Sequence, residues 1–298
     1  MVNLVTGSGG FVGKHFADKI PFLPLATEDG CKIDIRDETA LNEFCALHRF
    51  DRVVHLASQS FVPKSFEDPL ETFAVNFLGT YNLLGALKKH AFAGRFLFVG
   101  SGDEYGLVNE DRLPIREDLP VKPRSPYSVS KVAAEALCYQ WSQTETFQVV
   151  LARPFNHIGP GQSDRFVISN LAKQIIEIKR GTREPVLRVG DLEVTRDFTD
   201  VRDIISAYLL LLEEGKNGEV YNICSGREIK ISTLLRMLLE ISGVSADIEV
   251  DVSRLRTAEQ RRVAGCFEKL NRDTGWEPKI QIEESLTDIL QHWERTLS

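Results

Sequence analysis

Residues 2–13 read VNLVTGSGGFVG, an apolar run that leads directly into three evenly spaced glycines. The run Val2–Thr6 predicts a buried strand, and Gly7, Gly10 and Gly13 predict a tight turn from that strand into a helix. Glycines in such a turn let the backbone approach a pyrophosphate, to which the start of the helix offers N–H groups. A glycine triad by itself also occurs in ordinary strand-to-helix turns, so its meaning depends on the rest of the chain.

The rest of the chain alternates short apolar runs with helical patterns. Strands are expected at Phe22–Ala26, Arg52–Leu56, Arg95–Val99 and Gln148–Arg153, with helices near 11–18, 38–48, 70–90 and 127–145. This alternation predicts a parallel sheet with helices on both faces. Beyond residue 154 the pattern loosens, with strands expected near 186–189 and 220–224 and helices near 166–180, 202–214, 232–242 and 283–296. We expect an α/β fold, with a doubly wound parallel sheet in residues 1–154 and a smaller α/β lobe in 155–298 that returns some segments to the sheet.

Composition narrows the class of partner. The net charge is −7 and the basic residues are dispersed, which argues against nucleic acid. No apolar run approaches the ~18–20 residues of a membrane span, and the chain starts with a strand and turn instead of a targeting segment, so we expect a cytoplasmic protein.

The cysteines are far apart in the sequence and lack metal-ligand spacing, so we expect neither disulfides nor a metal site. We expect each cysteine to be a small buried side chain instead. They are Cys31, Cys45, Cys138, Cys224 and Cys266.

A serine, a tyrosine and a lysine are the candidate catalytic residues. Ser101 follows the apolar run Arg95–Val99, and Tyr127 and Lys131 stand four residues apart in a helical pattern, which places phenol and ammonium on one face. A cation about 4 Å away favours the phenolate by a few kcal/mol, so Lys131 is expected to lower the pKa of Tyr127. Taken alone, the pair is better explained by a half-buried helical tyrosine beside a solvated lysine.

Taken together, the glycine turn and Ser101, Tyr127 and Lys131 resemble the extended short-chain dehydrogenase/reductases that act on nucleotide sugars. The resemblance covers the whole chain, and it implies a Rossmann-type sheet, a nicotinamide cofactor and a substrate site in the C-terminal lobe. Cofactor contacts are implied for Gly7, Gly10, Phe11, Val12, Gly13, Asp34, Ile35, Leu56, Ala57, Tyr127, Lys131 and Pro154. Asp34 is also explained as an ordinary loop acid. The sequence does not choose between NADH and NADPH.

Three segments are similar to those of one branch of the family, the bacterial GDP-4-dehydro-6-deoxy-D-mannose reductases. They are residues 155–162 (FNHIGPGQ), 196–203 (RDFTDVRD) and 255–262 (LRTAEQRR). The resemblance implies that Asn156 meets the sugar nucleotide, that Arg196 and Arg256 meet its phosphates, and that Glu259 meets the ribose or base. A guanidinium clamps a diphosphate with paired hydrogen bonds, and a carboxylate accepts from ribose hydroxyls or the guanine edge. Each arginine taken alone is equally explained by a weak surface ion pair.

The resemblance implies a homodimeric reductase joined by the helices at 70–90 and 127–145, in which Ser101 and Tyr127 bind the C4 oxygen and the product is GDP-D-rhamnose. Reduction to the C4 epimer GDP-6-deoxy-D-talose, 4-epimerisation, 4,6-dehydration and a non-catalytic nucleotide sensor stay open. Asp103 stands where related dehydratases carry a glutamate, and it either touches the substrate or only orders its loop. Glu104 is expected to point to the opposite face of an extended segment.

Overall fold

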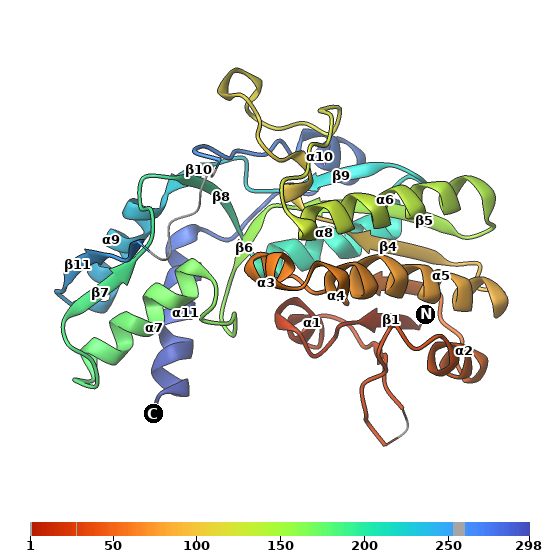
Figure 1. Ribbon diagram of the computed structural model, residues 1–298, viewed down its shortest axis with the longest axis horizontal. Helices are drawn as coiled ribbons and strands as arrows, with labels where there is room; N and C mark the ends of the chain where they lie inside the picture. The colour runs from red at the N-terminus through yellow and green to blue at the C-terminus, as the bar shows by residue number, and fades with distance from the viewer. Residues whose placement is uncertain (1, 28, 253–259) are drawn as a thin grey trace.

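The computed structural model describes residues 2–27, 29–252 and 260–298. Figure 1 shows a larger layered part beside a smaller part that holds the C-terminus. The larger part contains a six-stranded parallel sheet in the order β2-β1-β3-β4-β5-β9, which confirms the predicted doubly wound α/β class. Its strands are β1 (Asn3–Thr6), β2 (Leu23–Pro24), β3 (Arg52–His55), β4 (Arg95–Val99), β5 (Gln148–Pro154) and β9 (Val220–Ile223). The chain runs from β2 on one side of β1 to β3 on the other, which puts the switch point, where such sheets bind ligands, at the ends of β1 and β3.

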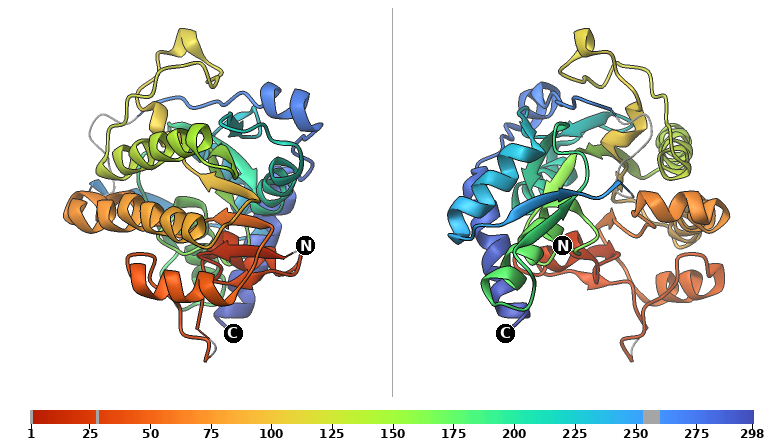
Figure 2. Two further views of the ribbon diagram at one scale, coloured as in Figure 1. Left: turned by 90° about the vertical axis from the view of Figure 1, so that its right-hand side faces the viewer. Right: turned by 60° about the vertical axis from the view of Figure 1, so that its left-hand side comes forward.

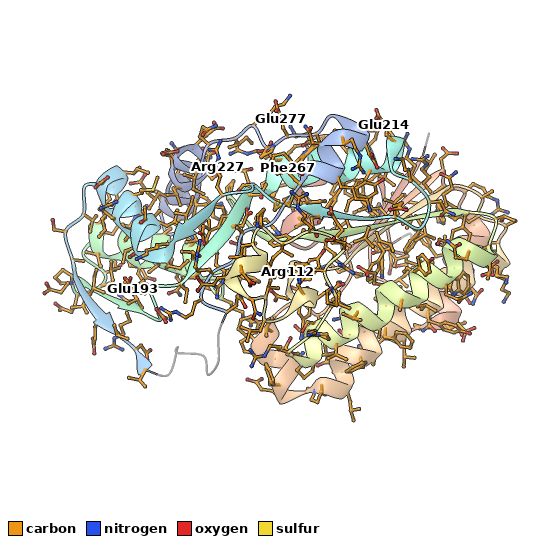
Figure 3. The ribbon with its side chains drawn as sticks, turned by 90° about the horizontal axis from the view of Figure 1, so that it is seen from above. Arg112, Glu193, Glu214, Arg227, Phe267 and Glu277 are labelled. Carbon is orange, nitrogen blue, oxygen red and sulfur yellow. The ribbon has the colours of Figure 1, made fainter. Side chains whose placement is uncertain are left out.

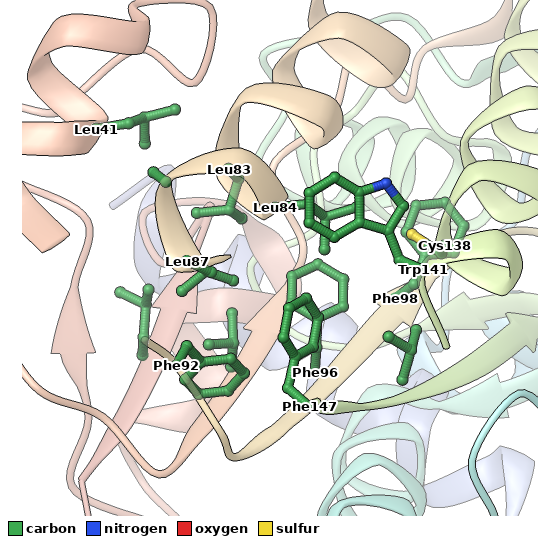
Figure 4. Close-up of a cluster of buried hydrophobic side chains, with 14 of the residues drawn as sticks. Leu41, Leu83, Leu84, Leu87, Phe92, Phe96, Phe98, Cys138, Trp141 and Phe147 are labelled. Atoms are coloured by element: carbon green, nitrogen blue, oxygen red, sulfur yellow. The ribbon is translucent and has the colours of Figure 1, made fainter. Parts of the chain in front are cut away.

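Helices cover both faces of this sheet, as its inner strands require because most of their residues are buried. One face carries α2 (Glu38–Leu47), α5 (Gly79–Lys89) and α6 (Pro126–Thr144); the other carries α1 (Phe11–Phe16), α8 (Val201–Glu214) and α10 (Glu268–Thr274). Figure 4 shows the core under α5, where Leu84 and Leu87 lie near Phe96 and Phe147. Burying one such side chain contributes ~1.5–3 kcal/mol, so the sheet is a firm support for the loops at its carboxyl end.

The smaller part is an α/β lobe with its own core. It contains a three-stranded sheet of β6 (Asn156–Ile158), β8 (Thr195–Asp200) and β10 (Glu228–Lys230), a strand pair of β7 (Val186–Val189) and β11 (Asp247–Val250), and the helices α7 (Val167–Lys179), α9 (Ile231–Ser242) and α11 (Ile282–Thr296). Figure 2 shows these helices gathered against the short strands. Sequence reasoning missed β6, β8, β10 and β11 because they are short and carry polar residues, as in TRDFTD of β8.

The predicted helix at 70–90 is interrupted. α4 (Pro69–Phe73) and α5 are joined by a π-helical turn at Ala74–Leu78. The turn directs Asn76 inward, where its amide donates to Ser130 Oγ at 2.9 Å and to the Gln59 carbonyl at 3.1 Å, while its oxygen accepts the Gln59 N–H at 2.8 Å. Asn76 therefore ties the loop after β3 to α6, and π turns of this kind are frequent near functional sites.

The surface matches the dispersed charge of the sequence. Seen from above in Figure 3, the exposed side chains of Glu193, Arg227, Glu277 and Glu214 lie along the outside of the molecule. Within the described ranges, every helix is too short or too polar to cross a bilayer. The expectation that all cysteines are buried is wrong for Cys31, which is exposed in the hairpin after β2.

Candidate active site

A cleft of about 1470 Å³ lies between the carboxyl ends of the parallel strands and the smaller lobe. One small ligand typically occupies a pocket of roughly 300–1,000 Å³, so this cleft has room for a cofactor and a substrate together. The predicted site residues that line it are Gly7, Gly10, Phe11, Val12, Gly13, Leu56, Ala57, Ser101, Asp103, Tyr127, Lys131, Pro154, Asn156 and Arg196. Asp34 and Ile35 do not line it, and Arg256 and Glu259 lie outside the described residues. The roles of all these residues stay predictions.

The glycine turn is packed so tightly that side chains are excluded from it. Gly7 has φ +68°, a conformation that suits glycine, and its carbonyl accepts the Gly10 N–H at 2.9 Å. A Cβ on Gly13 would lie 2.5 Å from Ser8 Cα and 2.6 Å from the Gly7 oxygen. The bare backbone at the end of β1 therefore fits the close approach of a dinucleotide pyrophosphate.

A chain of hydrogen bonds joins the glycine turn to the loop after β3. The Ala57 N–H donates to Thr6 Oγ1 at 3.1 Å, and Thr6 Oγ1 lies 2.8 Å from His55 Nδ1. His55 Nε2 lies 2.9 Å from Thr80 Oγ1, whose proton goes to the Asn76 carbonyl. Every donor and acceptor in this network is satisfied by a neutral His55 that carries its proton on Nε2. The network fixes the position of the glycine turn after β1 relative to the loop after β3.

The buried His55 makes stability depend on pH. Burial, helped by the charge of Lys131, lowers the pKa of His55 from its ordinary 6.5 to about 3. Below pH 6.5 the unfolded chain binds a proton that the folded imidazole refuses, so the free energy of unfolding falls as the pH falls, by about 2 kcal/mol at pH 5. Denaturant unfolding measures the free energy of unfolding at about pH 7.5 and pH 5. Its decrease between these two pH values should be about 2 kcal/mol smaller in His55→Gln than in the wild type. Equal losses in the two proteins would contradict this origin.

Ser101, Tyr127 and Lys131 meet at the end of β4. Ser101 begins a 3₁₀ turn at Gly102–Tyr105, where its hydroxyl accepts the Asp103 N–H at 3.1 Å. Tyr127 lies in the first turn of α6, which the Ser125 side chain caps, and Lys131 follows one turn later. The Lys131 ammonium donates to the Val99 carbonyl at 2.9 Å and lies 6.0 Å from the centre of the Tyr127 ring.

The predicted lowering of the Tyr127 pKa by Lys131 is wrong for this structure. Burial raises the pKa of Tyr127, the Asp103 carboxylate raises it further, and a hydrogen bond with Ser101 offsets only part of this rise. Burial also lowers the pKa of Lys131 to about 8. The ammonium is directed at the Val99 carbonyl, and the loss of water around the phenol outweighs its attraction. Tyr127 is therefore a neutral phenol at pH 7, which is the state that a proton donor requires.

Glu104 is not on the opposite face of an extended segment, because the chain there forms the 3₁₀ turn. The carboxylate is fully buried and accepts the Ser101 N–H at 2.8 Å. Arg153 Nε lies 3.2 Å from its other oxygen, and the same guanidinium binds Glu135 through bonds of 2.6 and 2.8 Å. Burial and the nearby Glu135 carboxylate raise the pKa of Glu104. Sequence reasoning missed this cluster, although an arginine inside the apolar run of β5 was a signal for a buried acid.

The cleft carries the predicted Arg196 and several polar groups that sequence reasoning missed. Arg196 Nη1 donates to the carbonyls of Thr195 at 2.7 Å and Gln260 at 3.0 Å, and Gln260 in turn exchanges two hydrogen bonds with the Val108 backbone. The Tyr208 hydroxyl faces the cleft from α8, fully buried and without a hydrogen-bond partner among the described residues. Other cleft residues not predicted are Phe61, Arg124, Gln162, Arg165 and Arg188.

The known proteins that this chain resembles are enzymes of nucleotide sugars with several different activities. A family model described as GDP-mannose 4,6 dehydratase matches residues 29–289. The chain is 49% identical over 295 residues to GDP-6-deoxy-D-mannose reductase of Pseudomonas aeruginosa, covering 97% of this chain and 96% of that protein. It is 26% identical to UDP-glucose 4-epimerase of Halalkalibacterium halodurans, covering 99% and 96%.

Solved structures agree with these sequence relatives. RMD from Pseudomonas aeruginosa complexed with NADPH matches with a TM-score of 0.93 and 48% identity over 99% of both chains. UDP-glucose 4-epimerase of Thermotoga maritima with UDP-glucose matches with a TM-score of 0.90 and 27% identity over 100% of both chains.

Proposed function

Because this chain belongs to the GDP-mannose 4,6-dehydratase family, a group of extended short-chain dehydrogenase/reductases, we propose that it reduces the C4 ketone of GDP-4-dehydro-6-deoxy-D-mannose with NADPH to GDP-D-rhamnose. The relative that is 49% identical is named for GDP-6-deoxy-D-mannose, the same compound as GDP-D-rhamnose. The observation that carries the proposal is that Ser101, Tyr127 and Lys131 lie together at the wall of a cleft with room for two ligands.

Each group of the site has one task in this reaction. NADPH, when bound, supplies the hydride that is added to C4. Tyr127 donates its proton to O4, and the Ser101 hydroxyl donates a hydrogen bond to the same oxygen while negative charge develops there. The Lys131 ammonium, 6.0 Å from the centre of the Tyr127 ring, would hold the nicotinamide ribose. The glycine turn holds the pyrophosphate of the cofactor, while Asn156 and Arg196 hold the sugar nucleotide from the lobe side.

The direct test is to incubate the protein with GDP-4-dehydro-6-deoxy-D-mannose and NADPH and to determine the C4 configuration of the product by NMR. We expect NADPH oxidation with GDP-D-rhamnose as the product. Formation of GDP-6-deoxy-D-talose would show that the ketone is reduced to the opposite C4 configuration and would contradict GDP-D-rhamnose as the product. Absence of turnover with a protein that binds both ligands would favour the nucleotide sensor instead.

The neighbouring activity in the family is 4,6-dehydration, and the residues after Ser101 disfavour it. Elimination of water across C5 and C6 needs one group to remove a proton and another to protonate the hydroxyl. Gly102 supplies neither, and a Cβ there would lie 3.1 Å from the Phe155 ring. Asp103 is about one C–C bond shorter than a glutamate, and misplacement by about 1 Å can cost ~10²-fold in rate.

We therefore predict little or no 4-keto-6-deoxy product from GDP-D-mannose and oxidised cofactor. Mass spectrometry of the sugar nucleotide measures the loss of one water. The control is reduction of GDP-4-dehydro-6-deoxy-D-mannose by the same enzyme sample, which shows that the enzyme is active. Dehydration at a comparable rate would make this protein a dehydratase.

We further propose a homodimer formed through the outer face of the helices between residues 62 and 144. Large apolar side chains stand exposed there, with Leu70 at 82%, Phe66 at 62% and Tyr81 at 52%. Exposed apolar patches of this kind favour protein contacts. Light scattering should give twice the mass of one chain for the wild type and the mass of a single chain for Leu70→Glu. A monomeric wild type would reject the dimer.

We also propose a cytoplasmic location, since a reducing compartment suits five free cysteines, among them the exposed Cys31.

A further inference from the structure

The hairpin after β2 returns a lysine to the glycine turn. The Thr27 N–H donates to the Cys31 carbonyl at 2.9 Å, and Lys32 pairs with Ala26 across the hairpin, which projects below β1 in Figure 1. A methyl group on Gly9 would lie 2.8 Å from Lys32 Nζ and 3.0 Å from its Cε. The Lys32 ammonium therefore lies directly over the bare backbone of Gly9.

The acids nearest in sequence are occupied by other groups. Asp29 accepts from the hydroxyl of Thr27 and from the Cys31 thiol, and these hydrogen bonds lower its pKa. Asp34 binds the Arg36 guanidinium, with Nε 3.0 Å from both carboxylate oxygens. By contrast, no hydrogen bond or ion pair within the described ranges engages the Lys32 ammonium, which leaves its charge for a ligand.

The position of this charge relative to the sheet identifies the part of the ligand that it meets. In a doubly wound sheet the pyrophosphate of a dinucleotide lies on the glycine turn after β1, and its adenosine ribose lies toward the chain after β2. A carboxylate about 20 residues beyond the glycines binds the 2′-hydroxyl of NAD, whereas a cation there accommodates the 2′-phosphate of NADP. Here Asp29 is held by its own hairpin, and Lys32 stands between the two segments.

Resting on the proposed function, we propose that Lys32 binds the 2′-phosphate of NADPH and thereby sets the preference for NADPH over NADH. Gly9 contributes by leaving room, since any side chain there would displace the ammonium. Arg36 is the other nearby cation, but Asp34 neutralises it. Lys32 is thus a cofactor-selecting residue, without a part in the hydride or proton transfer.

The test is equilibrium binding of NADPH and of NADH to Lys32→Met by calorimetry, without sugar substrate. Hydrogen bonds to charged groups support a loss of NADPH affinity of about 10- to 100-fold, with NADH affinity within about twofold of the wild type. Lys32→Arg should retain the NADPH affinity. Adenosine 2′,5′-bisphosphate should lose affinity for Lys32→Met as NADPH does, and ADP should not. Lys19→Met is the matched control, because it removes the same charge from an exposed site after α1.

Several results would overturn the assignment. Unchanged NADPH affinity in Lys32→Met, or an equal loss for NADPH and NADH, would show that Lys32 does not read the 2′-phosphate. A wild type that binds neither cofactor would overturn both this inference and the proposed function. A wild type that binds NADPH in a Lys32-dependent manner but reduces no GDP-linked ketone would support the inference and reject the function alone.

Discussion

Replacing Tyr127 with Phe should lower kcat by about 10² to 10⁴-fold, the usual contribution of a positioned proton donor. The change removes only the hydroxyl, and the phenylalanine ring fills the same buried space at the start of α6. Hydride addition to C4 would then leave an alkoxide beside Ser101 without a proton to neutralise it. The loss should appear equally in kcat and kcat/KM, because the interaction is made in the transition state.

The measurement is steady-state NADPH oxidation with the 4-keto sugar, together with NADPH affinity and thermal unfolding. Tyr139→Phe is the matched control, since it removes a hydroxyl from an exposed tyrosine on the same helix. We expect that variant to keep its activity. Near-normal turnover in Tyr127→Phe would remove this residue from the mechanism, and a parallel loss of NADPH affinity would point to a binding role instead.

Replacing Arg153 with Met should lower the free energy of unfolding by about 3–5 kcal/mol, the usual cost of removing one partner from a buried ion pair. Arg153 contacts the carboxyl groups of both Glu104 and Glu135, and its guanidinium carbon lies 4.7 Å from the centre of the Tyr105 ring. Without the cation these two acids face one another away from water. Since Glu104 accepts the Ser101 N–H, the same change should also displace Ser101 and reduce turnover.

Denaturant unfolding measures this cost. Arg183→Met is the control, because Arg183 makes a partly exposed ion pair with Glu177 that is worth about 0–1 kcal/mol. Adding Glu104→Gln to Arg153→Met should recover part of the loss by removing one of the opposed charges. A cost for Arg153→Met no larger than that for Arg183→Met would contradict the role of Arg153 as the neutralising partner.

Local sequence was sufficient for the larger sheet and for part of the cleft. The predicted runs Val2–Thr6, Arg52–Leu56 and Arg95–Val99 contain the strands β1, β3 and β4. Each run is short, mostly apolar and bounded by turn residues, and these are properties of neighbours along the chain. The glycine turn was predictable for the same reason, since its spacing and its strict need for small residues act within seven positions. The spacing of Tyr127 and Lys131 likewise determined that both lie on one face of α6.

Tertiary structure decided what these groups meet. The strands β8 and β10 have too few apolar residues to be recognised alone, and they exist because each supplies the other's backbone partners. The Glu104, Arg153 and Glu135 cluster joins residues up to 49 positions apart, and Lys32 reaches Gly9 only because the hairpin turns back. The protonation of Tyr127 was misjudged from sequence because a pKa follows desolvation and every nearby charge, and both depend on the segments that the fold places around the phenol.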